Sequence, residues 1–173
     1  MEDFKNMYQN IRFCVKCGAE LIIKDDRENK ERPHCENCGW IYYKNPIPAA
    51  ACVVINEQNE LLLVKRKFEP KALEWALPSG YIEIWQTPDE CAVEELREET
   101  GLIGEVSTFI DYYTGFSPFY IRVLSFGFVM KITGGELKAG DDALEAKFFK
   151  QEALPPICFW SHQHFLRKIN YIK

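Results

Sequence analysis

Residues 80–102 read GYIEIWQTPDECAVEELREETGL, and this stretch decides the fold. Thr87, Pro88 and Glu90 stand where an N-cap, a first helical residue and a capping-box acid are expected, so a helix should begin at Pro88. Gly101 is the residue type that ends a helix in the left-handed conformation. The segment therefore predicts a turn followed by one capped helix.

Three acidic residues of this helix carry the candidate chemistry. At 100° per residue, Glu95, Glu98 and Glu99 fall within an arc of about 100°, so their carboxylates share one helix face. Clustered carboxylate oxygens suit Mg²⁺ or Mn²⁺, which retain waters and are completed by substrate phosphates. The alternative is a solvated acidic face without a metal, which is the usual state of an acidic helix taken alone.

The same stretch resembles the Nudix signature G-x5-E-x7-R-E-U-x-E-E-x-G-U, where U is aliphatic. The positions that match are Gly80, Glu95, Leu96, Glu98, Glu99, Gly101 and Leu102. The flanking sequences LLLVKR at 61–66, WALP at 75–78 and LEAKFF at 144–149 are also similar to the family, so the resemblance covers most of residues 49–160. It implies an α/β fold, the Nudix α/β/α sandwich with a mixed sheet, and hydrolysis of a nucleotide-type diphosphate. It also implies catalytic Mg²⁺ or Mn²⁺ on Glu95, Glu98 and Glu99, which the loop from Gly80 would turn toward the phosphates.

Two positions depart from the signature. Gln86 stands where the family has its first glutamate, and Glu94 stands where it has the arginine that orients the neighbouring glutamate. Two interpretations remain open: an active hydrolase that keeps its metal-binding glutamates, or a non-catalytic nucleotide sensor or regulator. Arg97 could form a helix-surface ion pair with Glu94, three residues away.

Four cysteines precede this part of the chain in two matching pairs. Cys14 and Cys17, like Cys35 and Cys38, are separated by two residues, and each pair is directly followed by a glycine. Four thiolates close a tetrahedral Zn²⁺ site, which makes the predicted metal structural. His34 could be an alternative ligand, but four cysteines already complete the site, so His34 is expected to be a surface residue.

A zinc ribbon directly before a Nudix domain resembles the NADH pyrophosphatase and ADP-ribose pyrophosphatase branch. That resemblance implies a further acidic metal ligand before the last strand, with Asp142 as the candidate and Glu145 as a second one. An ordinary turn aspartate and strand-end glutamate are the alternative. The SQPWPFPQS motif that marks NAD(H) substrates is absent, because residues 112–120 read YYTGFSPFY. ADP-ribose, FAD and NAD(H)-like compounds therefore all remain candidate substrates.

Cationic side chains near these motifs are candidate phosphate contacts. Arg66 and Arg122 are the expected substrate-binding residues besides Gly80, and Lys65 and Lys67 flank Arg66. Ordinary surface charge is the alternative for all four cations. The aromatic residues of 112–120 could stack on a purine or lie in the core. The histidines at 162 and 164, near the start of the expected final helix, are assigned no chemistry.

The chain as a whole has the composition of a globular protein, with 173 residues, 47% of them hydrophobic. We expect a zinc ribbon over 1–45 and a Nudix domain over 46–173. In the latter, strands are expected at 49–55 and 60–67, forming a hairpin, and at 106–113, 122–132 and 146–149, with a final helix at 159–171.

Charge and hydrophobicity indicate which partners and which cellular location to expect. The net charge is −5, and residues 1–45 hold eight basic and eight acidic side chains, which argues against nucleic-acid binding. The first ten residues have no apolar core of a secretory signal, and no apolar run could cross a bilayer, so a cytoplasmic location without a membrane partner is expected. The expected partner is a small nucleotide diphosphate. The ribbon is expected to pack on the Nudix domain or on a partner subunit, which leaves a homodimer open.

Overall fold

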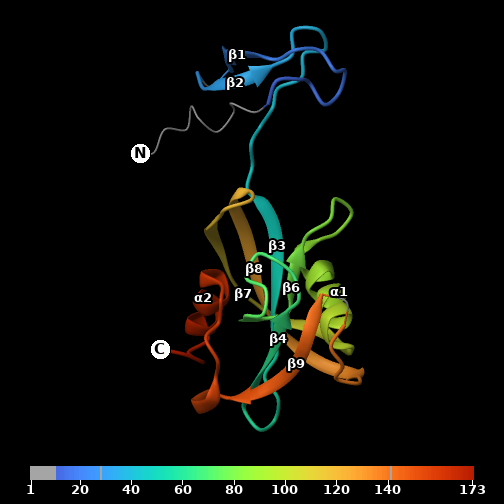
Figure 1. Cartoon of the computed structure of the whole chain (residues 1–173), viewed down its shortest axis with the longest axis vertical. Helices are drawn as coiled ribbons and strands as arrows, with labels where there is room; N and C mark the ends of the chain where they lie inside the picture. Colours follow the sequence, from blue (N-terminus) through green and yellow to red (C-terminus); the bar gives the residue numbers. More distant parts are fainter. Residues whose placement is uncertain (1–10, 28, 141) are drawn as a thin grey trace. The chain divides into compact units, whose positions relative to one another are not determined.

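The computed structural model describes residues 11–27, 29–140 and 142–173. The chain separates into two compact units at the boundary between Asn45 and Pro46. In the first unit, strands β1 (Ile22–Asp25) and β2 (Glu31–His34) form an antiparallel pair beside the four cysteines (Figure 1).

The second unit contains two β-sheets and two α-helices. Its elements are β3 (Ile47–Val53), β4 (Glu60–Arg66), β5 (Trp75–Ala76), β6 (Ser79–Tyr81), α1 (Pro88–Thr100), β7 (Leu102–Ser117), β8 (Ile121–Gly135), β9 (Ala143–Lys150), the short 3₁₀ helix η2 (Gln151–Ala153) and α2 (Trp160–Lys168). The larger sheet has the order β6-β3-β8-β7, in which only the β3–β8 pair is parallel, and the smaller has the order β5-β4-β9. The α/β architecture with a mixed sheet is therefore confirmed.

Strand β3 separates two hydrophobic cores. Successive strand residues point to opposite faces, so Ala50 and Cys52 pack in the core beneath α1, whereas Ala51 and Val53 pack in the core beneath α2. The helix α2 lies close to β8, because a Cβ at Gly127 would lie 2.5 Å from the ring of Phe165. The result is a sandwich with α1 and α2 covering opposite faces (Figure 1).

The expectation that residues 49–55 and 60–67 pair with each other as the two strands of a hairpin is wrong. An isolated bridge between Ile55 and Leu61 joins the two segments, after which they enter different sheets. Both edges of β3 are already taken by β6 and β8, so β4 finds its partners in β5 and β9 instead. The turn itself forms as expected, with the Asn56 side chain accepting backbone hydrogen bonds from Gln58 and Glu60.

Several element boundaries also differ from expectation. The strands β7 and β8 extend well beyond 106–113 and 122–132, because they pair with each other over almost their whole length. The helix α2 is shorter than 159–171 and ends at Lys168. In the described part of the chain, no helix combines the length and apolar character needed to span a bilayer.

Candidate functional site

The helix α1 begins and ends where its capping residues predict. Thr87 is the N-cap and forms a reciprocal capping box with Glu90, and Pro88 is the first helical residue. Gly101 ends the helix with φ of 70°, and its amide donates to the carbonyl of Arg97. These local bonds satisfy free backbone groups at both ends, and so they fix where the helix begins and ends.

The loop before α1 holds two of its glutamates. The backbone amide of Ser79 donates to Oε2 of Glu99 at 2.9 Å. The backbone of Gly80 lies against Glu95, because a Cβ placed on this glycine would fall 1.8 Å from Oε1 of Glu95. The glycine at the start of the signature is therefore required by contact with the first metal-type glutamate.

Burial and mutual repulsion dominate the electrostatics of these acids. Burial, followed by the charges of Glu98, Asp142 and Glu94, raises the pKa of Glu95 to about 7. Burial raises the pKa of Glu99 to about 8, against the opposing effects of the Ser79 amide and the Arg66 charge. Buried carboxylates that repel one another are an environment that a divalent cation stabilises, so the residues present fit Mg²⁺ or Mn²⁺.

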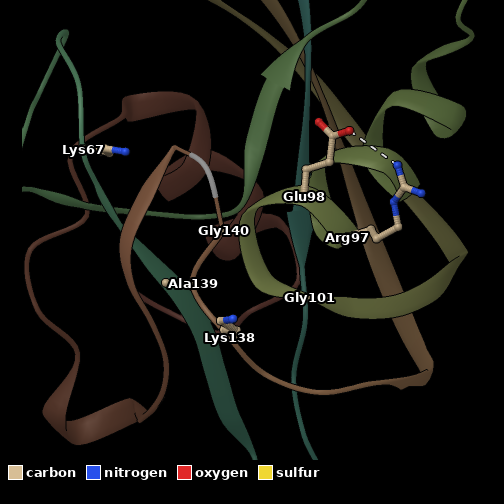
Figure 2. Close-up of a pocket in the computed structure, with 7 residues that line it drawn as sticks. All are labelled: Lys67, Arg97, Glu98, Gly101, Lys138, Ala139 and Gly140. Carbon is tan, nitrogen blue, oxygen red and sulfur yellow. Dashed lines mark hydrogen bonds and ion pairs between the residues drawn. The ribbon is translucent and has the colours of Figure 1, made fainter.

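Glu98 is the exposed member of the three. Its carboxylate lies 3.4 Å from the guanidinium of Arg97, and Figure 2 shows this ion pair. Among the described residues, only the cysteines of the first unit already bring three or more metal-binding groups within 4.8 Å of one another. Glu95, Glu98 and Glu99 do not form such a group in the described structure, so a metal shared by them requires their carboxylates to move closer together.

A hollow of about 420 Å³ lies beside Glu98. It is lined by Lys67, Arg97, Glu98, Gly101, Lys138, Ala139 and Gly140 (Figure 2). Three of these side chains are cationic, so the hollow offers positive charge next to the acidic helix face. Lys67 was expected as a phosphate contact, whereas Lys138 and Arg97 were not.

The two residues that depart from the signature contact each other. The side-chain amide of Gln86 donates to the carboxylate of Glu94, and its Oε1 accepts the backbone amide of Glu83 at 2.8 Å. Arg97 lies 3.7 Å from Glu94, which confirms the expected helix-surface pair. The loop and the helix are thus joined at these positions by an amide–carboxylate hydrogen bond.

The two acids before the last strand differ in their surroundings. The charge of Asp142 contributes to the raised pKa of both Glu95 and Glu99, so Asp142 lies near these glutamates. Glu145 instead forms an ion pair of 2.9 Å with Lys65, its direct neighbour across β4 and β9. Of the two candidates, only Asp142 is brought to the acidic site.

The two arginines expected to bind substrate also lie in different places. Arg66 is close enough to the glutamates to oppose the raised pKa of Glu99, and its Nε donates to the carbonyl of Pro70 at 2.8 Å. Arg122 is an exposed residue near the start of β8, next to the β7–β8 turn. The described contacts bring Arg66, but not Arg122, to the acidic site.

One residue at the site escaped the sequence interpretation. The Nδ1 atom of His162 accepts the backbone amide of Leu77 at 3.1 Å, just before the loop that contacts the glutamates. Burial, with the nearby Arg66 charge, lowers the pKa of His162 to about 3, so the ring is neutral. No local pattern signals this role, because the two residues are 85 positions apart.

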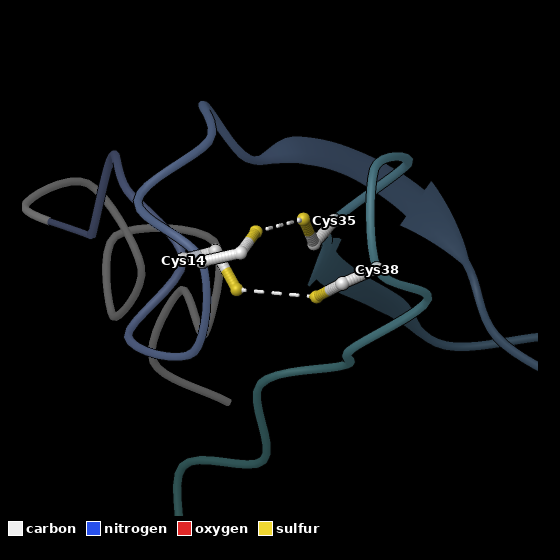
Figure 3. Close-up of side chains that lie close together, drawn as sticks. Cys14, Cys35 and Cys38 are labelled. Atoms are coloured by element: carbon white, nitrogen blue, oxygen red, sulfur yellow. Dashed lines mark hydrogen bonds between the residues drawn. The ribbon is translucent and has the colours of Figure 1, made fainter.

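The cysteines of the first unit form a second candidate metal centre. The Sγ atoms of Cys14 and Cys38 lie 3.6 Å apart, those of Cys17 and Cys35 lie 3.4 Å apart, and no disulfide joins them (Figure 3). A tetrahedron with Zn–S distances of ~2.3 Å has sulfur separations of ~3.8 Å, so this arrangement fits zinc.

Both cysteine turns have the same backbone geometry. The glycines after each pair, Gly18 and Gly39, have φ of 75° and 73°. Their amides donate to the carbonyls of Cys14 and Cys35, which closes each turn around its thiols. His34 is half-buried, and its Nε2 is buried without a hydrogen-bond partner among the described residues.

Comparison with known proteins identifies relatives of this arrangement. Residues 45–169 match the family model of the NUDIX domain. The chain is 41% identical over 117 residues to an ADP-ribose pyrophosphatase of Methanocaldococcus jannaschii, covering 66% of this chain and 68% of that protein. It is 27% identical over 156 residues to the NAD-capped RNA hydrolase NudC of Vibrio vulnificus, covering 89% of this chain and 56% of that protein. The chain thus spans about half the length of its NudC relatives.

Solved structures show the same fold. A crystal structure of a NUDIX hydrolase from Nitrosomonas europaea superposes with a TM-score of 0.78 at 27% identity, covering 91% of this chain and 89% of that one. The superposition therefore includes most of the chain.

Proposed function

The chain belongs to the NUDIX domain family, and we propose that it is a metal-dependent hydrolase that cleaves the diphosphate of ADP-ribose or of a similar nucleotide. The observation that carries this proposal is the acidic face of α1, where the half-buried Glu95 and the buried Glu99 have raised pKa values close to Glu98 and Asp142. Burying several like charges is unfavourable unless a cation or protons compensate them. Such an arrangement is expected where a divalent metal binds.

The metal would be held by Glu95, Glu98, Glu99 and Asp142. When bound, Mg²⁺ or Mn²⁺ neutralises the diphosphate and lowers the pKa of a bound water that attacks phosphorus. The chain's own contribution is to hold the acids in place. The Ser79 amide fixes Glu99, and the backbone of Gly80 limits the position of Glu95.

Positive charge beside the acids supports binding of an anionic substrate. Arg66 lies near Glu99, and the hollow next to Glu98 adds Lys67 and Lys138. The exposed ring of Tyr120 contacts Tyr81, directly after Gly80, with ring centroids 5.4 Å apart. This pair provides an aromatic surface on which a base could stack. Arg122, which has no described contact with the acids, is a weaker candidate.

We rank the candidate substrates by the names of the relatives and by their sequence identity to this chain. ADP-ribose comes first, because the archaeal ADP-ribose pyrophosphatase has the higher identity. NADH, FAD and NAD-capped RNA follow, the last from the name of the NudC relatives. We propose a structural zinc ion for the four cysteines, separate from the catalytic metal.

Hydrolysis of this panel in the presence of Mg²⁺ or Mn²⁺ tests the proposal. Wild-type protein should release AMP from ADP-ribose, and Glu98→Gln and Glu99→Gln should each reduce kcat by at least about 100-fold. Glu105→Gln is the matched control, since this exposed acid on β7 pairs with Lys131 and is not among the four proposed metal ligands. Nucleotide binding without turnover would instead identify a sensor, and turnover unchanged in both glutamine variants would refute the proposed active site.

A further inference from the structure

The acidic site depends on a short segment that crosses between the two sheets. Strand β5 pairs with β4 in the smaller sheet, whereas β6 pairs with β3 in the larger one. Leu77 and Pro78 form the crossing between them, and both are buried. Directly after the crossing, Ser79 and Gly80 contact Glu99 and Glu95. Any shift of the crossing would therefore move the groups that hold Glu99 and Glu95.

Each polar backbone group of the crossing needs a partner, because it has no water to bind. The carbonyl of Pro78 accepts the amide of Cys52 at 2.8 Å. The amide of Leu77, a fully buried residue, has a side chain as its partner: it donates to Nδ1 of His162. The neutral ring that accepts at Nδ1 carries its proton on Nε2.

The start of α2 is fastened to the same segment. Ile157 forms a parallel bridge with Trp75, and the amide of Cys158 donates to the carbonyl of Trp75 at 2.9 Å. The ring of Phe159 lies between the His162 ring, 5.1 Å away, and the Arg66 guanidinium, 5.2 Å away. The same short stretch of chain thus contacts both the crossing and Arg66, the cation whose charge acts on Glu99.

These contacts connect a helix on one face of the sandwich to the acids on the other face. We propose that His162 is a positioning residue of the hydrolase site, which acts through Leu77 and Ser79 to hold Glu99 and Glu95 in their metal-binding positions. This role rests on the proposed function of the same site. It differs from ordinary core packing in one respect: what matters is a hydrogen-bond acceptor at the Nδ1 position, and not the volume of the ring.

Three variants of α2 separate these two roles. His162→Leu fills the space but removes the acceptor, whereas His162→Asn can place its Oδ1 close to the position of Nδ1. His164→Leu is the matched control on the same helix, because His164 contacts Asp111 of β7 and not the crossing. The whole chain of 173 residues is used throughout, and any metal bound by the four cysteines is left in place.

Direct Mn²⁺ titration and steady-state kinetics on ADP-ribose supply the readouts. His162→Leu should weaken Mn²⁺ binding by about tenfold and lower kcat by ~10–100-fold, the usual range for residues that orient metal ligands. KM should change much less. His162→Asn should recover most of both losses, and His164→Leu should keep the wild-type Mn²⁺ affinity. Hydrogen exchange of the peptide covering residues 77–81 should become faster in His162→Leu only.

The alternative outcomes are distinct. Wild-type Mn²⁺ affinity in His162→Leu, or equal losses in His162→Leu and His162→Asn, would overturn the positioning role. If His162→Leu does not fold, His162→Gln replaces it, because the longer side chain carries its oxygen away from the Nδ1 position. A wild-type protein that binds Mn²⁺ but hydrolyses nothing would refute the proposed function alone, since the Mn²⁺ titrations still decide the role of His162.

Discussion

The side-chain amide of Gln86 donates a hydrogen bond to the carboxylate of Glu94, joining the loop before α1 to the helix. These are the two positions at which the chain departs from the Nudix signature, and they contact each other. The consequence is electrostatic. Glu94 adds a negative charge beside Glu95 and contributes to its raised pKa, after burial and the charges of Glu98 and Asp142.

Restoring the signature should therefore strengthen metal binding. In the double variant Gln86→Glu with Glu94→Arg, a cation replaces an anion next to Glu95, which favours the ionised form of that ligand. We expect Mn²⁺ affinity at pH 7 to rise by about tenfold, measured by direct titration. Glu94→Gln, which only removes the like charge, should give a smaller gain. Unchanged or weaker binding in both variants would show that Glu94 does not oppose metal binding.

Adding one methyl group at Gly80 should disable the site. The new Cβ of Gly80→Ala would overlap the carboxylate of Glu95, and only displacement of that side chain or of the loop relieves the clash. A misplacement of this size can reduce kcat by about 100-fold. Gly134→Ala is the control, because nothing lies within 4 Å of a Cβ at that strand position. Equal kcat values in the two variants would contradict the contact.

The metal-free protein should lose stability as the pH rises from 6.5 to 8.5. The pKa values of Glu95 and Glu99 are raised from 4.5 to about 7 and about 8, so the folded state holds protons that the unfolded state has released. Their contribution to stability is present below pH 4.5 and is lost as the pH passes through the folded-state values. Thermal unfolding with and without Mg²⁺ measures this effect, and Mg²⁺ should restore stability at the upper end.

The pH scan starts at 6.5 because, below this pH, His162 changes the stability of the protein in the opposite direction. The pKa of His162 is lowered from 6.5 to about 3, so stability falls when the pH drops below 6.5 and the unfolded state takes up a proton first. Glu99→Gln should flatten the metal-free profile above pH 6.5. A wild-type profile that is already flat in this window would contradict the raised pKa values.

Loss of zinc should unfold the first unit and spare the second. Cys35→Ser removes one ligand of the tetrahedral set, and a small unit with few buried apolar residues depends on its metal. Elemental analysis should find zinc in the wild-type protein and little in this variant. Cys158→Ser, in the second unit, should keep the full zinc content. The cooperative unfolding of the second unit should remain in both variants, and its loss with zinc would show that the two units fold together.

The local features of the helix α1 could be predicted because they depend on neighbouring residues. The capping residues Thr87 and Gly101 act within one turn, and the placement of Glu95, Glu98 and Glu99 on one face follows from helical periodicity. The four cysteines could be predicted for the same reason, since each pair lies within one turn. These features made the family recognisable without a structure.

The pairing of β3 and β4 could not be predicted in the same way. Their turn sequence favours a hairpin, but the edges of β3 are filled by β6 and by β8, which follows about seventy residues later. A strand takes the partners that the whole sheet offers, and this competition is not visible in a local pattern. Nor could a local pattern predict that Asp142 lies near the glutamates whereas Glu145 pairs with Lys65.

The sequence by itself determined which residues could carry the chemistry: three glutamates on a capped helix and four cysteines in two turns. Their spacing within single turns is sufficient, because the geometry of a helix or turn is set by its own backbone. Only the tertiary structure decided how these groups are held. Gln86 reaches Glu94 through the loop before α1, and His162 reaches Leu77 across 85 positions. Packing buries polar groups, and each buried polar group needs a hydrogen-bond partner. In these two contacts, another element of the fold supplies that partner.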